Sequence, residues 1–205
     1  MAAMLAACGG GSSSDANEAA GTYDVRVTNA SFPAAQHLGQ TSLMELAVRN
    51  TGKKALPTLT VTVSVAGKQG QNSSLPFGIS DPQTGLAQPD RPVWVLAQGY
   101  PRLAGSSDPG GATTSNRKTF SFGPLKPGAT TEAVWKLSAV KAGKFTVLYR
   151  VEAGLSGKAK AETNDVPAGG SFATEISAAL PDTEVTDDGE VVEKAEQRKR
   201  PEPGE

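Results

Sequence analysis

The chain has one cysteine and one histidine among its 205 residues, so few kinds of side-chain chemistry are open to it. A single cysteine excludes an internal disulfide and a cysteine-rich zinc site, and a single histidine excludes a multi-histidine metal centre. A serine hydrolase would need His37 as its base, but no Gly-x-Ser-x-Gly nucleophile motif occurs. No Gly-Lys pair is followed by Ser or Thr, so there is no P-loop. We therefore expect no metal, no cofactor and no enzymatic activity.

Cys8 is the residue whose surroundings point to a definite reaction. It follows Leu5-Ala6-Ala7, an aliphatic residue and two small ones, and it precedes the Gly/Ser run 9–14. This order resembles the lipobox of bacterial lipoproteins, in which a signal peptidase cuts before the cysteine and the cysteine is then acylated. The resemblance implies that Cys8 is a lipid acceptor, a role suited to the strongly nucleophilic thiolate. The run 9–14 has the composition of a flexible tether.

The segment before this motif is short. Only MAAM precedes Leu5, whereas a signal peptide has a basic segment and an apolar segment of about 7–15 residues. We therefore expect the true start to lie upstream of Met1, and the protein to be exported and lipid-anchored on the extracytoplasmic face of the cell membrane. The alternative is a tail that contains an incidental cysteine.

Charge is unevenly distributed along the chain. Residues 182–205 hold nine acidic and four basic residues, a net charge of −5, which leaves +4 on residues 1–181 because the whole chain carries −1. The near-neutral total argues against nucleic acid as a partner. The segment 181–205 has almost no large apolar residues, so we predict a mostly disordered tail, with a short strand possible near its start.

Between these ends, apolar residues alternate with polar ones, which predicts β-strands. The pattern is strongest in YDVRV (23–27), MELAV (44–48), LTVTVSV (59–65), AVWKLSA (133–139) and FTVLYRV (145–151). Turn sequences separate the strands, among them Asn50-Thr51-Gly52-Lys53, Pro127-Gly128 and Ala142-Gly143, and no segment shows helical spacing. Strands at this spacing indicate a β-sandwich.

The segments AVRNTGKKALPTLTVTV and GPLKPGATTEAVWKLSAVKAGKFTVLYRVEA resemble the two halves of CARDB-type and related bacterial immunoglobulin-like domains. The resemblance implies an all-β fold: an immunoglobulin-like antiparallel β-sandwich with a long Pro/Gly-rich insertion and disordered termini. We divide the chain into a truncated signal, lipobox and tether (1–21), the sandwich (22–180, with the insertion at about 68–118) and the charged tail (181–205).

The insertion contains one apolar island, Pro92-Val93-Trp94-Val95-Leu96, which we interpret as an edge strand or a docked segment. Trp94 and Tyr100 form a candidate binding surface, since exposed aromatic residues anchor partners. In the competing interpretation, Trp94 packs over the end of the sandwich and holds the loop down.

The functional hypothesis is a membrane-anchored bacterial surface lipoprotein whose domain is a non-catalytic structural or interaction module. Its partners would be the membrane, through lipid on Cys8, and an envelope protein or polysaccharide. Two alternatives stay open. One is a carbohydrate- or protein-recognition domain that acts through Trp94 and Tyr100. The other is a hydrolase built on acidic residues that the sequence does not pair.

Overall fold

The structure is a computed structural model that describes residues 18–66, 77–79, 92–106, 111–113, 118–178, 183–185, 187–189 and 191–193. Cys8 and most of the insertion lie outside these residues. All regular elements of the described ranges are β-strands. They are β1 Gly21–Ser31, β2 Ala35–His37, β3 Thr41–Asn50, β4 Thr60–Val65, β5 Phe77–Ile79, β6 Trp94–Leu96, β7 Arg102–Leu103, β8 Ala112–Thr113, β9 Thr119–Ser121, β10 Thr130–Ala139, β11 Gly143–Glu152, β12 Ala159–Thr163, β13 Val166–Pro167, β14 Gly169–Ser177, β15 Thr183–Val185 and β16 Val191–Glu193.

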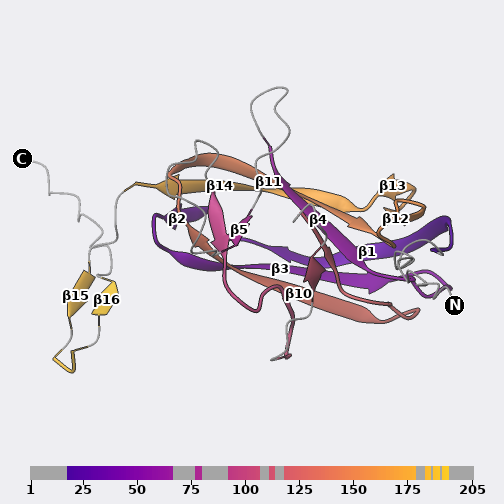
Figure 1. The fold of residues 1–205 in the computed structure, drawn as a ribbon, viewed down its shortest axis with the longest axis horizontal. Coiled ribbons are helices and arrows are strands. Elements are labelled where there is room, and N and C mark those ends of the chain that lie inside the picture. Colours follow the sequence, from indigo (N-terminus) through magenta and orange to yellow (C-terminus); the bar gives the residue numbers. More distant parts are fainter. Residues whose placement is uncertain are drawn as a thin grey trace, which may run out of the picture.

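Two groups of paired strands form the body of the protein (Figure 1). One group, the β3 sheet, has the order β1-β3-β10-β6-β5, with β7 also paired to β10. The other, the β11 sheet, has the order β14-β11-β4-β9-β8. Aromatic rings from the two groups meet, as Phe120 of β9 lies edge-on to Trp135 of β10 at 5.8 Å. The core is therefore the layer between the two sheets.

Strand β1 belongs to both sheets. Its start, Gly21–Asp24, pairs in parallel with β12, and Val25–Ser31 pairs antiparallel with β3, with a register shift between Val27 and Asn29. Short β2 then pairs in parallel with the end of β14. These pairings join the two sheets along one edge of the sandwich.

The strand order defines the fold class. The order β1-β3-β10-β6 opposite β14-β11-β4 is that of strands A-B-E-D opposite G-F-C in an immunoglobulin-like sandwich. The predicted all-β, immunoglobulin-like class is confirmed.

The alternating patterns predict the core strands well. Every second residue of LTVTVSV, AVWKLSA and FTVLYRV points inward, and these residues are buried except Phe145, which is half-buried. The pattern fails at Ala47 and Thr60, which are buried despite positions predicted to face solvent. Thr60 tolerates burial because its hydroxyl donates to the Gly154 carbonyl at 3.0 Å.

The turn after β3 forms by a different mechanism from the one predicted. We predicted a turn at residues 50–53 because Asn and Gly tolerate positive φ, but neither Asn50 nor Gly52 is among the positive-φ residues, whereas Gly128 is, with φ 75°. Instead the Asn50 side-chain oxygen accepts the Gly52 N–H at 3.0 Å, which is an Asx-type turn.

The described parts of the insertion belong to the sandwich. β6 pairs antiparallel with β10, and β5 pairs in parallel with β6. Phe77, Val93, Trp94 and Leu96 are all buried. The apolar island is thus a sheet strand that contributes directly to the core. It is not the edge strand of our first interpretation, because β5 pairs with its outer side.

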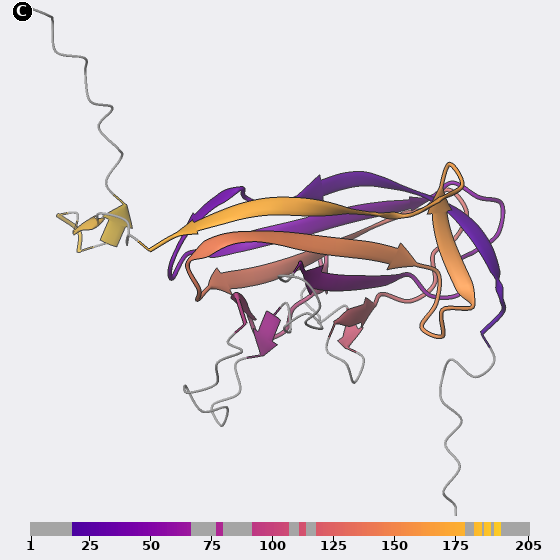
Figure 2. The same ribbon diagram turned by 90° about the horizontal axis from the view of Figure 1, so that it is seen from above.

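The two ends of the sandwich differ. The start of β1 and the end of β14 lie at opposite ends of the long axis (Figures 1 and 2). Beyond β14, β15 and β16 pair with each other as a separate two-stranded sheet. The chain therefore enters the sandwich at one end of its long axis and leaves it at the other.

Candidate functional site

Trp94 does not form a binding surface. Its side chain is fully buried, and its indole N–H donates to the Gln36 side-chain oxygen at 2.9 Å. Phe32 and Phe145 contact its ring edge-on, with centroids at 5.4 and 5.8 Å. The prediction of an exposed anchor at this position is wrong, because pairing with β10 turns the side chain into the core.

Tyr100 is half-buried and packs against the edge of the core. The Arg102 guanidinium lies 4.6 Å from its ring centroid, and Arg102 Nε donates to the Gly99 carbonyl at 3.0 Å. The exposed part of Tyr100 is thus already contacted by an arginine of the same chain. The structure does not bring Tyr100 and Trp94 together as one surface.

The titratable groups show no catalytic arrangement within the described ranges. None of the buried polar residues there is an Asp, Glu, Lys, Arg or His, and no group of three or more His, Cys, Asp or Glu could hold a metal ion. Glu152 faces Arg150 at 3.6 Å, and His37 is half-buried. Burial raises the pKa of the Tyr149 hydroxyl, a core residue stacked on Phe172. The described part of the chain thus gives no support to the hydrolase alternative.

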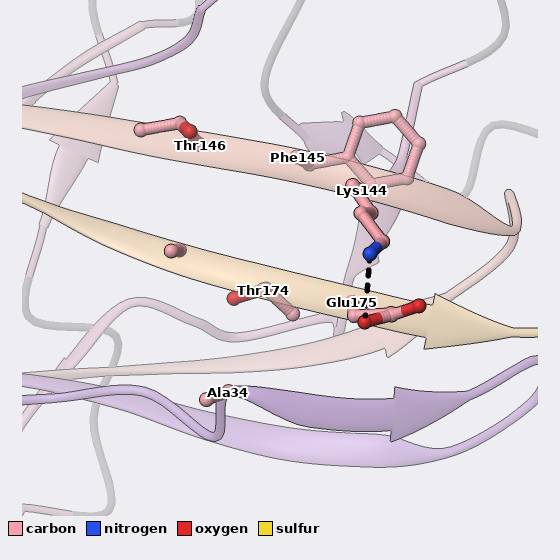
Figure 3. A pocket seen from close by; sticks show the side chains of 7 residues that line it. Ala34, Lys144, Phe145, Thr146, Thr174 and Glu175 are labelled. Carbon is pink, nitrogen blue, oxygen red and sulfur yellow. Dashed lines mark ion pairs between the residues drawn. The ribbon is translucent and has the colours of Figure 1, made fainter.

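A shallow groove of about 320 Å³ runs along β11 and β14, beside the segment before β2 (Figure 3). Lys144 reaches across it to Glu175, with 3.5 Å between nitrogen and oxygen. Both side chains of this pair are mostly exposed, at 80% and 64%. Exposed pairs contribute little energy, and the buried polar residue of the lining, Thr174, already donates its hydroxyl to the Pro33 carbonyl at 3.4 Å.

The most definite polar arrangement lies where the N-terminal segment joins the domain. The Glu18 carboxylate accepts the backbone N–H groups of Leu155 and Ser156, at 2.9 and 2.8 Å, in the turn between β11 and β12. The Gly21 N–H then donates to the Lys158 carbonyl at 3.1 Å, and β1 continues beside β12. Glu18 therefore fixes the point at which the chain from Cys8 meets the sandwich.

Gly154 makes this arrangement possible. A Cβ on Gly154 would occupy the position of the Glu18 carboxylate. Sequence reasoning did not find this contact, because Glu18 and the amides that it binds are 137 and 138 residues apart.

Replacing Gly154 with alanine should displace Glu18 without unfolding the sandwich. The Leu155 and Ser156 amides would lose a charged acceptor, so their hydrogen exchange should accelerate by about tenfold or more, as expected for two charge-assisted bonds. The same amides should respond to Glu18→Gln by a smaller acceleration. Amide exchange followed by NMR measures both effects, and core amides of β11 serve as the internal control. Unchanged exchange at both amides in Gly154→Ala would show that Glu18 does not hold this turn.

A second set of hydrogen bonds joins neighbouring loops at the end of the sandwich where the N-terminal segment is attached. Asn50 is fully buried, and its side-chain nitrogen donates to the carbonyls of Lys54 and Leu125, at 2.8 and 2.9 Å. The Thr58 N–H donates to the Ala153 carbonyl. The loops after β3, before β10 and after β11 are thus joined in one unit.

Comparisons with known proteins found similar solved structures only. No protein-family model matches the chain, and no curated protein matches it. Similar solved structures include the CARDB domain of the PF1109 protein from Pyrococcus furiosus, at 12% identity and a TM-score of 0.40 over 76% of this chain and 86% of that one. Native Escherichia coli alpha-2-macroglobulin matches at 16% identity and 0.41, over 77% of this chain and 7% of that one. The ASH/PapD-like domain of human CEP192 matches at 13% and 0.35, over 77% and 85%.

The chain thus contains an immunoglobulin-like β-sandwich, and CARDB domains are among the solved structures similar to it, as the sequence resemblance led us to expect. The described ranges hold no helix long and apolar enough to cross a membrane. Such sandwiches carry many unrelated functions, so function must be argued from the residues of this chain.

Proposed function

We propose that this chain is a bacterial lipoprotein, anchored to the extracytoplasmic face of the membrane through lipid on Cys8, whose sandwich is a non-catalytic structural or interaction module. The sequence around Cys8 supports the anchor. The observation that carries the proposal further is the attachment of Glu18 to the turn after β11.

That attachment sets the geometry of anchoring. Residues 9–17 lie between Cys8 and Glu18, and nine residues span at most about 30 Å when fully extended. A lipid on Cys8 therefore keeps the β11–β12 end of the sandwich near the bilayer. The end of β14 lies opposite the start of β1 (Figure 2). In this proposal that end points away from the membrane, toward the envelope protein or polysaccharide that we propose as the partner.

Expression from the full-length gene in a bacterial host tests the anchor. We expect the protein in the membrane fraction, with cleavage before Cys8 and an N-terminal peptide whose mass includes a diacylglyceryl group. Cys8→Ser should remove the modification and release the protein when the membranes are washed at high salt. Ser12→Ala, in the Gly/Ser segment 9–14, should change neither the modification nor the membrane association. An unmodified Cys8 in a cytosolic protein would refute the proposal.

A further inference from the structure

Four lysines project from the end of the sandwich at which the N-terminal segment joins it. Lys53 and Lys54 lie in the loop between β3 and β4, Lys126 lies in the loop between β9 and β10, and Lys158 lies in the turn between β11 and β12. All four are exposed. We call this group the lysine end.

Hydrogen bonds hold the lysine loops in a fixed arrangement. The Lys54 and Leu125 carbonyls accept from the same Asn50 nitrogen, so the chain at Lys54 lies beside the residue that precedes Lys126. The Lys158 carbonyl accepts from Gly21 at the start of β1. The lysines are thus presented together by a folded surface.

Carboxylates do not neutralise the lysine end. Within the described ranges, none of the four lysines forms an ion pair. Four acidic residues belong to the same end. The Glu18 oxygens are taken up by backbone N–H groups, Asp24 is exposed, Glu162 of β12 lies opposite Asp24, and the exposed Asp165 follows β12. Glu152 pairs with Arg150. The exposed Lys160, Arg26 and Arg49 lie near the same end, because Lys160 is opposite Thr22 and Arg26 is opposite Arg49. Together with the four lysines they make seven basic groups against the carboxylates of Glu18, Asp24, Glu162 and Asp165, which leaves this end positive.

The other end of the sandwich carries an ion pair. There Lys144 is paired with Glu175, and the chain continues into the acidic segment 182–205, of net charge −5. The basic end of the sandwich is the end at which the N-terminal segment joins it.

We propose that the lysine end binds the headgroups of anionic phospholipids and so gives the protein a second contact with the membrane, besides the lipid on Cys8. The orientation rests on the proposed function, because the tether keeps this end within reach of the bilayer. Charges act on one another over a Debye length of about 8 Å at physiological salt. Each lysine close to an anionic surface strengthens binding by about fivefold. A diacylglyceryl group on Cys8 supplies two chains, and a basic surface adds an electrostatic contact to that hold.

The test uses the full chain with Cys8→Ser, which cannot be acylated, so that only the protein surface contributes. It is sedimented with vesicles of equal parts phosphatidylglycerol and phosphatidylcholine at low salt, and with pure phosphatidylcholine vesicles. We expect binding to the anionic vesicles only, and a decrease as salt is raised. Adding Lys53→Gln and Lys54→Gln should lower the partition constant by about tenfold or more.

A matched variant controls for net charge. Lys136→Gln with Lys141→Gln removes the same charge from exposed positions outside the lysine end, and it should leave binding within about twofold of the parent. The proposal would be overturned if the Lys53/Lys54 and Lys136/Lys141 variants lost vesicle binding equally. Binding that does not depend on anionic lipid would also overturn it. The outcome is independent of acylation: an unmodified Cys8 refutes the anchor alone, whereas absent vesicle binding refutes the headgroup contact alone.

Discussion

Replacing Trp94 with alanine should lower the free energy of unfolding by about 3–5 kcal/mol, the range for removing a large buried aromatic side chain. The ring is fully buried between Phe32 and Phe145, so its removal leaves a cavity between the two sheets. The substitution also leaves the buried Gln36 side-chain oxygen without its donor. Because folded domains are stable by only about 5–15 kcal/mol, much of the stability would be lost.

Urea denaturation followed by circular dichroism measures this change. Trp94→Phe keeps most of the ring volume but removes the indole donor, so it should cost less than alanine, about 1–3 kcal/mol. Tyr100→Ala is the matched control, since its half-buried ring lies at the margin of the core, and it should cost less than either substitution at Trp94. If Trp94 were instead an exposed ligand anchor, its alanine variant would unfold at the same urea concentration as the wild type.

The sequence predicts the strands of the sandwich well where one face of a strand is buried and the other is exposed to solvent. Val61 and Val63 alternate with Thr62 and Ser64, and the structure buries the first two. Alternation is visible in a single sequence because it is a property of the strand itself. The position of a strand in the sheet is not visible in this way. The burial of Trp94 depends on pairing with β10 and on Gln36, which is 58 residues away.

The same limit explains what was missed at the attachment point. Glu18 stands in a polar segment with no pattern of its own, and its partners are backbone N–H groups, which any sequence provides. The lysine end is likewise assembled from three separate loops. Net charge by segment gave +4 for residues 1–181 but could not show that four lysines share one end. Cys8 differs from these two features, because the lipobox-like motif that identifies it consists of residues adjacent to it in the sequence.

Asn50 should be the polar residue whose loss most affects the tether end, and Asn50→Ala should lower the free energy of unfolding by about 2–4 kcal/mol. The substitution removes the amide that binds both the Lys54 and Leu125 carbonyls, and it leaves a cavity at a fully buried position. The Leu125 carbonyl keeps the Leu56 N–H and the Gly52 N–H keeps the Asp24 carbonyl, so the Lys54 carbonyl is the group that loses its donor. An unsatisfied buried polar group costs about 1–3 kcal/mol. Thr51→Ala, at the exposed neighbouring position, is the control and should change stability by about 0.5 kcal/mol or less.

Asn50→Asp separates hydrogen bonding from packing at this site, because the two side chains have nearly the same shape. The introduced carboxylate can still accept from Gly52, but it would face the Lys54 and Leu125 carbonyls with no proton to donate. Burial against two acceptors should raise its pKa above the unfolded value. The deficit relative to the wild type should therefore be full at neutral pH and shrink as pH falls through that raised pKa, when the protonated acid can donate to one carbonyl. Urea titrations of both proteins at pH 7 and at pH 4 measure this difference, and a deficit that is equal at both pH values would show that the Asn50 amide protons do not hold the loops together.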